Sequence, residues 1–168
     1  EYNADSSPTL TTSGNVELTL SGNNTVKHTY DTRTAIDIDD DGGWNNRTPG
    51  LLTIKGNGSL TAEAPSSGIR IDNGTLDVTD GTVNATAADN GIYALGNTVQ
   101  VSGGTLCATA TGEHSTGIEA SHNGQVTVSS GKLTASGGGF GIAAGQLEMS
   151  GGTLNASAKE TVAITGSS

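Results

Sequence analysis

Apolar and polar residues alternate in short segments along most of the chain. In many segments two apolar residues flank one polar residue, as in Leu76-Asp77-Val78 and Ile69-Arg70-Ile71. A period of two residues predicts β-strands with one buried face. Gly, Asn, Asp and Ser separate the segments, and these residues are typical of turns. The pattern therefore predicts an all-β chain built from many short strands.

The segments recur in groups of three. Five clear copies of the group start 24, 23, 27 and 21 residues apart, and a less regular copy precedes them. The copies start at Leu52, Leu76, Val99, Val126 and Leu147, and the earlier one at Val16. Repeats of this length indicate a solenoid, whereas a propeller blade needs about 40 residues and a leucine-rich repeat a different Leu/Asn framework. We predict a right-handed parallel β-helix of about six three-strand coils.

The repeat also sets the expected domain boundaries. Residues 1–14 are predicted to be an N-terminal cap or lead-in, and residues 15–168 to form the β-helix, with an insertion at about 39–50. The sequence ends within a coil, after "VAITGSS". An uncovered coil leaves a free strand edge. We therefore expect either further chain beyond this coil or a partner, including end-to-end self-association through the C-terminal coil.

Composition narrows the classes of partner. Leu, Ile, Val and Phe make up less than a fifth of the 168 residues, which would indicate disorder if the repeat did not organise them. The net charge of −10 argues against nucleic acid, which requires clustered cations. No apolar run approaches the ~18 residues of a membrane span, so membrane insertion is not expected. Cations, neutral glycans or a positively charged partner remain the favoured ligands.

Outward positions of the third segment carry the most varied side chains. In successive coils this position holds Asp37, Arg70, Tyr93 and Glu119, and then small residues. The tyrosine ring offers a surface for sugar stacking, and the charged groups offer hydrogen bonds. These four residues are the predicted ligand-binding set. The alternative is a solvated face on which the charges pair across rungs.

The stretch "IDIDDDGGWNN" (36–46) contains a candidate metal site. Asp37, Asp39 and Asp41 before Gly42 resemble the first half of an EF-hand loop, but Thr48 stands where that loop has a bidentate Glu. The strand pattern places Asp37 on the ligand face. Asp39 and Asp41 are therefore the predicted ligands of a weak calcium site.

Two stretches carry a resemblance to a known family. "SGGTLCATATGEHSTGIEASHNGQVTVSSGKLTASG" and "NGIYALGNTVQVSGGTL" resemble Gly/Thr/Ala-rich cell-surface solenoids of Gram-positive bacteria, and more specifically the carbohydrate-binding β-helix family related to pectate lyases. The resemblance begins at about residue 9. It implies an extracellular or cell-wall-attached bacterial protein that binds plant or host polysaccharide, with calcium in several members and usually no catalysis.

Catalysis is disfavoured by the residues themselves. Glycoside hydrolysis needs two carboxyl groups on either side of one bond, about 5–9.5 Å apart. Asp37 and Glu119 are expected three rungs apart, which is about 14 Å at the usual strand spacing. A calcium-dependent lyase would have to use Arg70 as its base. We expect a non-catalytic carbohydrate-binding or adhesin module that recognises polysaccharide or a surface glycan; the alternatives are a structural solenoid spacer, a filament-forming repeat or a polysaccharide lyase.

Overall fold

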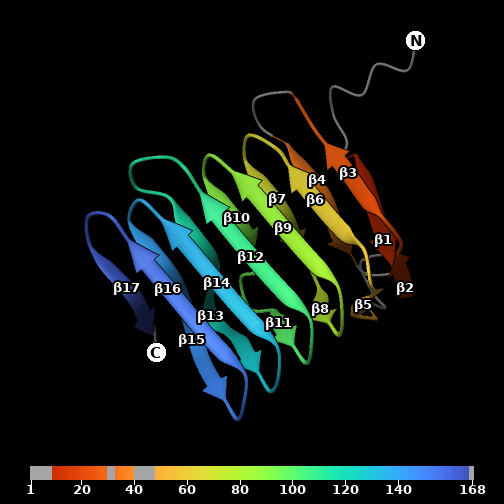
Figure 1. Cartoon of the computed structure of the whole chain (residues 1–168). Helices are drawn as coiled ribbons and strands as arrows, with labels where there is room; N and C mark the ends of the chain where they lie inside the picture. The colour runs from red at the N-terminus through yellow and green to blue at the C-terminus, as the bar shows by residue number, and fades with distance from the viewer. Residues whose placement is uncertain (1–8, 30–32, 40–47, 167–168) are drawn as a thin grey trace.

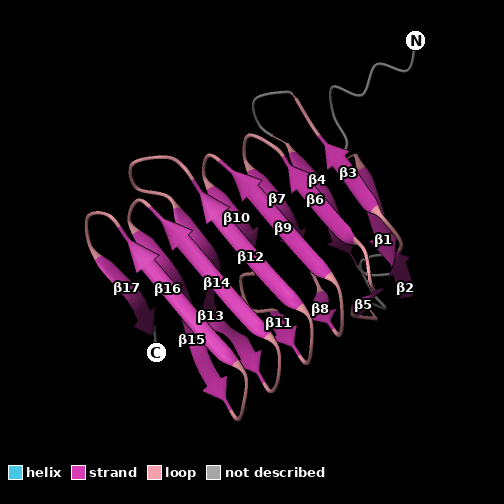
Figure 2. Cartoon of the chain, in the orientation of Figure 1, coloured by secondary structure: helices cyan, strands magenta, loops and turns pink. Residues whose placement is uncertain are grey.

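The computed structural model describes residues 9–29, 33–39 and 48–166, and every regular element within them is a β-strand. The strands wind into a parallel β-solenoid of about six coils, shown in Figures 1 and 2. The predicted fold class, an all-β parallel solenoid of this size, is therefore confirmed. None of the described residues belongs to a helix long and apolar enough to cross a membrane.

Each coil contributes a first, a second and a third strand in the same order. The first strands are β2 (Asn15–Leu20), β5 (Gly50–Gly56), β8 (Gly74–Val78) and β11 (Thr98–Val101). The second strands are β3 (Asn23–Lys27), β6 (Ser59–Glu63), β9 (Thr82–Ala87), β12 (Thr105–Ala110), β14 (Lys132–Gly137) and β16 (Thr153–Ala158). The third strands are β1 (Leu10–Ser13), β4 (Thr34–Asp39), β7 (Ser67–Ile71), β10 (Asn90–Tyr93) and β17 (Val162–Gly166). Two long strands, β13 (Thr116–Val128) and β15 (Phe140–Met149), serve as the third strand of one coil and the first strand of the next.

The strands stack coil upon coil into two sheets. The second strands form a six-stranded sheet in the order β16-β14-β12-β9-β6-β3. The first and third strands belong to one larger sheet, because β13 and β15 run continuously from one position to the other. Neighbouring strands come from neighbouring coils and run parallel, as in the pairing of β7 with β10 and of β10 with β13. A side chain at one position therefore lies beside its equivalent in the next coil.

Inward-facing apolar residues fill a narrow core. The positions predicted to face inward in the middle coils are almost completely buried, and a fully buried Leu, Ile or Val contributes about 1.5–3 kcal/mol. They include Leu52, Ile54, Leu60, Ile69, Ile71, Leu76, Val78, Val83, Ile92, Val99, Val101, Leu106, Ile118, Val126, Val128, Leu133 and Ile142. Stacked columns of aliphatic residues thus supply a continuous core from few large side chains.

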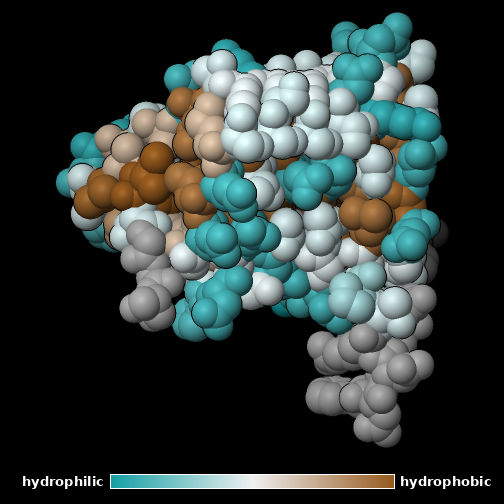
Figure 3. Space-filling model, turned by 90° about the horizontal axis from the view of Figure 1, so that it is seen from below, coloured by the Kyte–Doolittle hydropathy of each residue, from teal (hydrophilic) through white to brown (hydrophobic). Residues whose placement is uncertain are grey.

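The sixth coil departs from this pattern. The alternation assigns Met149, Val162 and Ile164 to inward positions, but they are 48%, 46% and 41% exposed. Met149 and Ile164 pair with the core residues Val128 and Ile142, whereas Val162 pairs with Phe140, which is not a core residue. Within the described residues, β16 and β17 of coil 6 each pair with one strand, β14 and β15 respectively, so a neighbouring coil lies on one side of coil 6. Figure 3 shows apolar surface gathered toward this end of the molecule.

The alignment of β17 also differs from the prediction. The sequence pattern placed Ala163 beside Ala143 on the outward face, but Ala143 pairs with Thr165 because Ile142 pairs with Ile164. A shift of two residues keeps the same side chains on the same face, so alternation alone does not distinguish the two registers. Thr165 therefore replaces Ala163 on this rung.

A column of small residues forms the corner where the second and third strands approach each other. It consists of Ala35, Gly68, Gly91, Gly117, Gly141 and Ala163, each one position before an apolar residue of the third strand. A Cβ atom on Gly117 would lie 2.5 Å from the carbonyl oxygen of Gly141 and 2.7 Å from the amide nitrogen of Ser136. Glycine here permits backbone from two sheets to pack in direct contact.

The start of the described chain adds one further rung. β1 pairs in parallel with β4, with Leu10 beside Ile36 and Thr11 beside Asp37. The segment predicted as a cap therefore contains a strand that extends the third column beyond coil 1. Most of the predicted insertion, residues 40–47, lies outside the described residues.

Candidate functional site

The four predicted ligand-binding residues lie on consecutive rungs of one lateral face, which we call the β4–β13 face. Asp37 pairs with Arg70, Arg70 with Tyr93, and Tyr93 with Glu119. They come from β4, β7, β10 and β13, and each stands between two apolar residues or at the end of its strand. The structure thus places them in one row, at about 4.8 Å per rung. Their role as ligands stays a prediction.

Arg70 on the β4–β13 face forms an ion pair with Asp72, and not with Asp37 on the neighbouring rung. The Arg70 guanidinium donates hydrogen bonds to the Asp72 carboxylate, with Nε–Oδ1 and Nη2–Oδ1 distances of 2.6 Å. Asp72 follows β7 directly, and its amide donates to the Ile38 carbonyl at 2.9 Å, which places it beside the end of β4. Arg70 is therefore held by the residue that directly follows its own strand.

Asp37 is the electrostatically perturbed group of this face. Burial raises the pKa of its carboxyl group from 3.8 to about 6, and the nearby carboxylates of Asp72 and Asp39 add to the rise, while Arg70 opposes it. Its Oδ1 atom is buried and has no hydrogen-bond partner among the described residues. A carboxyl group in this environment gains from a hydrogen-bond donor or a cation brought by a ligand.

Glu119 at the other end of the row is pre-positioned by a neighbour. The Ser121 hydroxyl donates a hydrogen bond to Oε1 of Glu119 from two residues further along β13. One carboxylate oxygen is thereby engaged within the protein. The row therefore presents a protected carboxyl group at Asp37, a fixed cation at Arg70, a half-buried ring at Tyr93 and an oriented carboxylate at Glu119.

A hollow of about 220 Å³ opens between the side chains in the middle of this row. Arg70 and Tyr93 line it together with Thr34, Ser66, Ser67 and Asn90. Thr34, Ser67 and Asn90 are themselves stacked in register at the starts of β4, β7 and β10. Hydroxyl, amide, guanidinium and phenol groups supply both donors and acceptors, and the tyrosine ring supplies an apolar surface. This combination suits a polyhydroxylated ligand.

The predicted calcium ligands are only partly within the described chain. Asp39 ends β4 and is half-buried, whereas Asp41 lies outside the described residues. The acidic neighbour that the sequence interpretation missed is Asp72. Its position could have been inferred, because aligning Ile71 with Ile38 places Asp72 directly beside Asp39.

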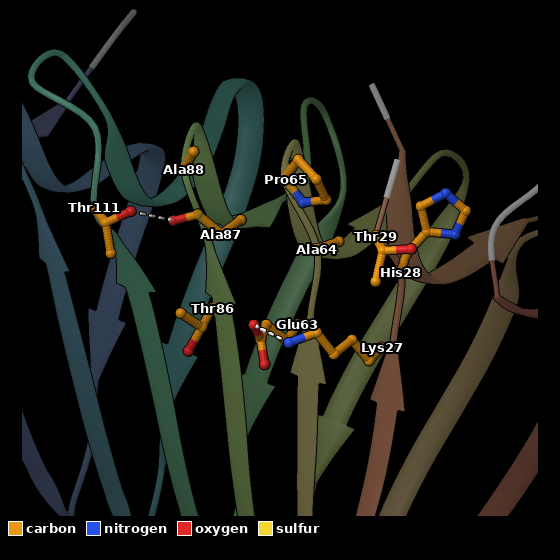
Figure 4. Close-up of a pocket in the computed structure, with 10 residues that line it drawn as sticks. All are labelled: Lys27, His28, Thr29, Glu63, Ala64, Pro65, Thr86, Ala87, Ala88 and Thr111. Carbon is orange, nitrogen blue, oxygen red and sulfur yellow. Dashed lines mark hydrogen bonds and ion pairs between the residues drawn. The ribbon is translucent and has the colours of Figure 1, made fainter. Parts of the chain in front are cut away.

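A second and larger hollow, which the sequence interpretation also missed, lies at the corner after the second strands. Its volume is about 440 Å³, and Figure 4 shows the side chains around it. Lys27 and Glu63 point toward each other and form an ion pair at 2.7 Å, while small residues such as Ala87 and Ala88 form much of the rest. A smaller hollow of about 190 Å³ shares Thr111 with it and continues toward Lys159. We call this pair of hollows the corner groove.

Fold and surface together define a parallel β-solenoid with a polar lateral hollow at Arg70 and Tyr93 that suits a hydroxyl-rich ligand. Comparison with family models gives a match over residues 10–167 to the family described as "Carbohydrate-binding domain-containing protein". The chain therefore belongs to this carbohydrate-binding family. Neither the curated proteins nor the solved structures contain a significant match.

Proposed function

We propose that the chain is an extracellular, non-catalytic module that binds an extended polysaccharide along the β4–β13 face. The observation that carries the proposal is the hollow between Arg70 and Tyr93, bordered by a row of hydroxyl and amide groups. Rungs repeat every 4.8 Å or so along the solenoid. This distance is comparable with the length of one sugar unit in an extended chain, so neighbouring coils meet neighbouring sugars.

Charge favours a neutral polysaccharide over an acidic one. The chain carries a net charge of −10, and the cation on the face, Arg70, is already paired with Asp72. Asp37 and Glu119 would repel the carboxylates of an acidic glycan unless a divalent cation stood between them. Neutral polysaccharides are therefore the expected ligands. The family resemblance of the sequence adds the expectation of an extracellular or cell-wall-attached bacterial protein.

Two features support binding without catalysis. Asp37 and Glu119 are separated by the rungs of Arg70 and Tyr93, which corresponds to about 14 Å and exceeds the spacing used in glycoside hydrolysis. Arg70, the residue that a lyase would use as a base, is fixed in an ion pair with Asp72. A lyase would generate unsaturated products from pectin in the presence of calcium, and we expect no increase in their ultraviolet absorbance.

The binding proposal is tested with insoluble polysaccharides and a glycan array. Tyr93→Ala and Arg70→Ala should each reduce binding at least about tenfold, a loss equivalent to about 1.4 kcal/mol. Tyr93→Phe keeps the ring and separates stacking from the hydroxyl group. Lys27→Ala is the matched control, because Lys27 is also paired with a carboxylate but lies in the corner groove. Loss of binding in Lys27→Ala with full binding in Arg70→Ala would move the site to the corner groove and overturn the assignment.

Calcium forms a separate part of the proposal. Asp39 ends β4 near Asp37 and Asp72, so the negative potential here favours a divalent cation. Asp39 and Asp41 with loop carbonyls would supply the oxygen ligands that calcium prefers. Calcium bound there would lie beside the ligand face and could bridge it to an acidic group on a glycan.

A second candidate function is that of an adhesive or structural spacer that associates end to end. The exposed apolar residues Met149, Val162 and Ile164 favour it, as do the edges of β16 and β17 that pair with no strand of the described chain. Stacking of a second copy on coil 6 would cover this surface. Sedimentation at increasing concentration should then show self-association that Ile164→Lys abolishes; a chain that stays monomeric at all concentrations would remove this candidate.

A further inference from the structure

Three metal-ligating side chains converge at the turns between the second and third strands, on the C-terminal half of the solenoid. Glu113 and His114 belong to the turn of coil 4, and Glu160 belongs to the turn of coil 6. One donor atom from each of the three lies within 4.8 Å of the others. Within the described residues this is the group of His, Cys, Asp and Glu side chains that meets the geometry for holding a metal ion.

The turn of coil 5 explains how coils 4 and 6 can meet. It consists of Gly138 and Gly139, so no side chain separates the two neighbouring turns. Backbone hydrogen bonds hold the three turns in a stack. The Gly139 amide donates to the Ser115 carbonyl oxygen at 2.9 Å, and the Glu160 amide donates to the Gly138 carbonyl oxygen at 3.0 Å. A Cβ atom on Gly138 would lie 2.0 Å from the Glu113 carbonyl oxygen. The bare turn is therefore required by the packing and leaves the space above it to the three side chains.

The separation of the donor atoms is close to that around a bound ion. Nδ1 of His114 lies 3.5 Å from Oε2 of Glu160. Zinc binds imidazole nitrogen and carboxylate oxygen at about 2.0–2.2 Å, so two ligands of one zinc ion are about 3.0–3.5 Å apart. The His114 side chain is 87% exposed and that of Glu160 is 42% exposed, so small rotations can complete the approach without moving the backbone.

We propose that Glu113, His114 and Glu160 bind a divalent first-row transition ion such as zinc. An imidazole with two carboxylates suits zinc and its neighbours, whereas calcium requires six to eight oxygen ligands. Water fills the remaining coordination positions, because the cluster is open to solvent. Glu113 and His114 also line a hollow of about 280 Å³, together with Asp89 and Ser115, and this hollow leaves room for the waters. This site is distinct from the β4–β13 face and does not depend on carbohydrate binding.

Bound zinc would link coil 4 directly to coil 6 across the glycine turn. Coil 6 exposes the inward residues Met149 and Ile164, and among the residues that the structure describes its strands β16 and β17 each pair on one side. A metal link adds a contact that the parallel strands do not provide. Zinc should therefore protect the amides of β16 and β17 from hydrogen exchange more than those of the N-terminal coils.

The test uses the whole chain without a histidine tag, titrated with zinc chloride and followed by NMR of the three histidine rings and by calorimetry. Zinc should shift the ring resonances of His114, and chelator should reverse the shift. His114→Asn and Glu160→Gln should each weaken zinc binding at least about tenfold. His122→Asn is the matched control, because His122 is also exposed and has φ of 57°, a conformation that Asn tolerates. Glu148→Gln serves as the exposed carboxylate control.

Each outcome decides the question. Saturable binding of one zinc ion that is weakened in His114→Asn and Glu160→Gln but retained in both controls supports the site. Zinc that leaves the His114 resonances unchanged, or affinity that falls equally in His122→Asn, overturns it. Circular dichroism of every variant without zinc establishes that the solenoid is intact, so a loss of binding cannot be attributed to unfolding.

Discussion

Replacement of Asp37 by asparagine should make the solenoid more stable at neutral pH. The Asp37 carboxyl group is half-buried, its Oδ1 atom is without a hydrogen-bond partner in the described chain, and the carboxylates of Asp72 and Asp39 are close. These surroundings penalise the charged form and raise the pKa of Asp37 from 3.8 to about 6. Asparagine has nearly the same shape and carries no charge, so it removes the penalty while filling the same space.

The size of the effect and its pH range follow from the pKa. Since the folded state holds the Asp37 proton more tightly than the unfolded state, the free energy of unfolding falls as the pH rises from about 4 to about 6 and then levels off. The pKa change corresponds to about 3 kcal/mol at about 1.4 kcal/mol per pKa unit. Solvent reaches part of the side chain and screens the charge, which reduces the expected gain to about 1–2 kcal/mol. Asp37→Asn should match the parent chain near pH 4 and exceed it above pH 6.

Urea denaturation at a series of pH values, in the presence of chelator, measures this difference. Asp89→Asn is the control, because it removes one negative charge from an exposed turn. It should leave the pH dependence of unfolding as in the parent chain. A constant difference between Asp37→Asn and the parent from pH 4 to pH 8, or a variant that is less stable at pH 7, would refute the electrostatic explanation.

Two further predictions concern packing and calcium. Gly117→Ala should lower the free energy of unfolding by about 2–3 kcal/mol, because the added methyl group meets backbone of both sheets at the corner; an unchanged urea midpoint would contradict the packing described for this column. Calcium should raise the melting temperature, and Asp39→Asn combined with Asp41→Asn should abolish the rise; a rise that persists in the double variant would place the ion elsewhere.

Much of the fold could be predicted because one apolar pattern is repeated in every coil. Alternation around Leu76 and Val78 identifies a strand, and its recurrence at Val99 and Val101 identifies the neighbour with which it pairs. The same reasoning failed at β17, since a two-residue shift preserves the buried face. Alternation also marks Ile164 as an inward residue, although Ile164 is 41% exposed on coil 6, where its strand pairs on one side within the described residues.

The sequence was sufficient to predict which residues share the row on the β4–β13 face, but not which side chains contact one another there. Register follows from the repeat, so Asp37, Arg70, Tyr93 and Glu119 could be placed on neighbouring rungs. The actual partner of Arg70 is Asp72, which lies just beyond the alternating segment at residues 69–71 and therefore carries no signal in the pattern. His114 and Glu160 come together because the turns of coils 4, 5 and 6 differ in length. A repeat pattern describes what the coils share, so it does not reveal contacts that depend on such differences.

The constant register between the first strands of the middle coils means that the solenoid can grow or shrink by whole coils. Strand β8 pairs with β5 on one side and β11 on the other through equivalent residues, with Leu76 between Leu52 and Val99. Excision of one middle coil would bring together two edges that already fit each other. Duplication of a coil during evolution would lengthen the molecule by one rung and leave every other contact in place. The length of polymer that such a protein can contact can thus change by one coil at a time during evolution, without a change in the residues that contact the ligand on each rung.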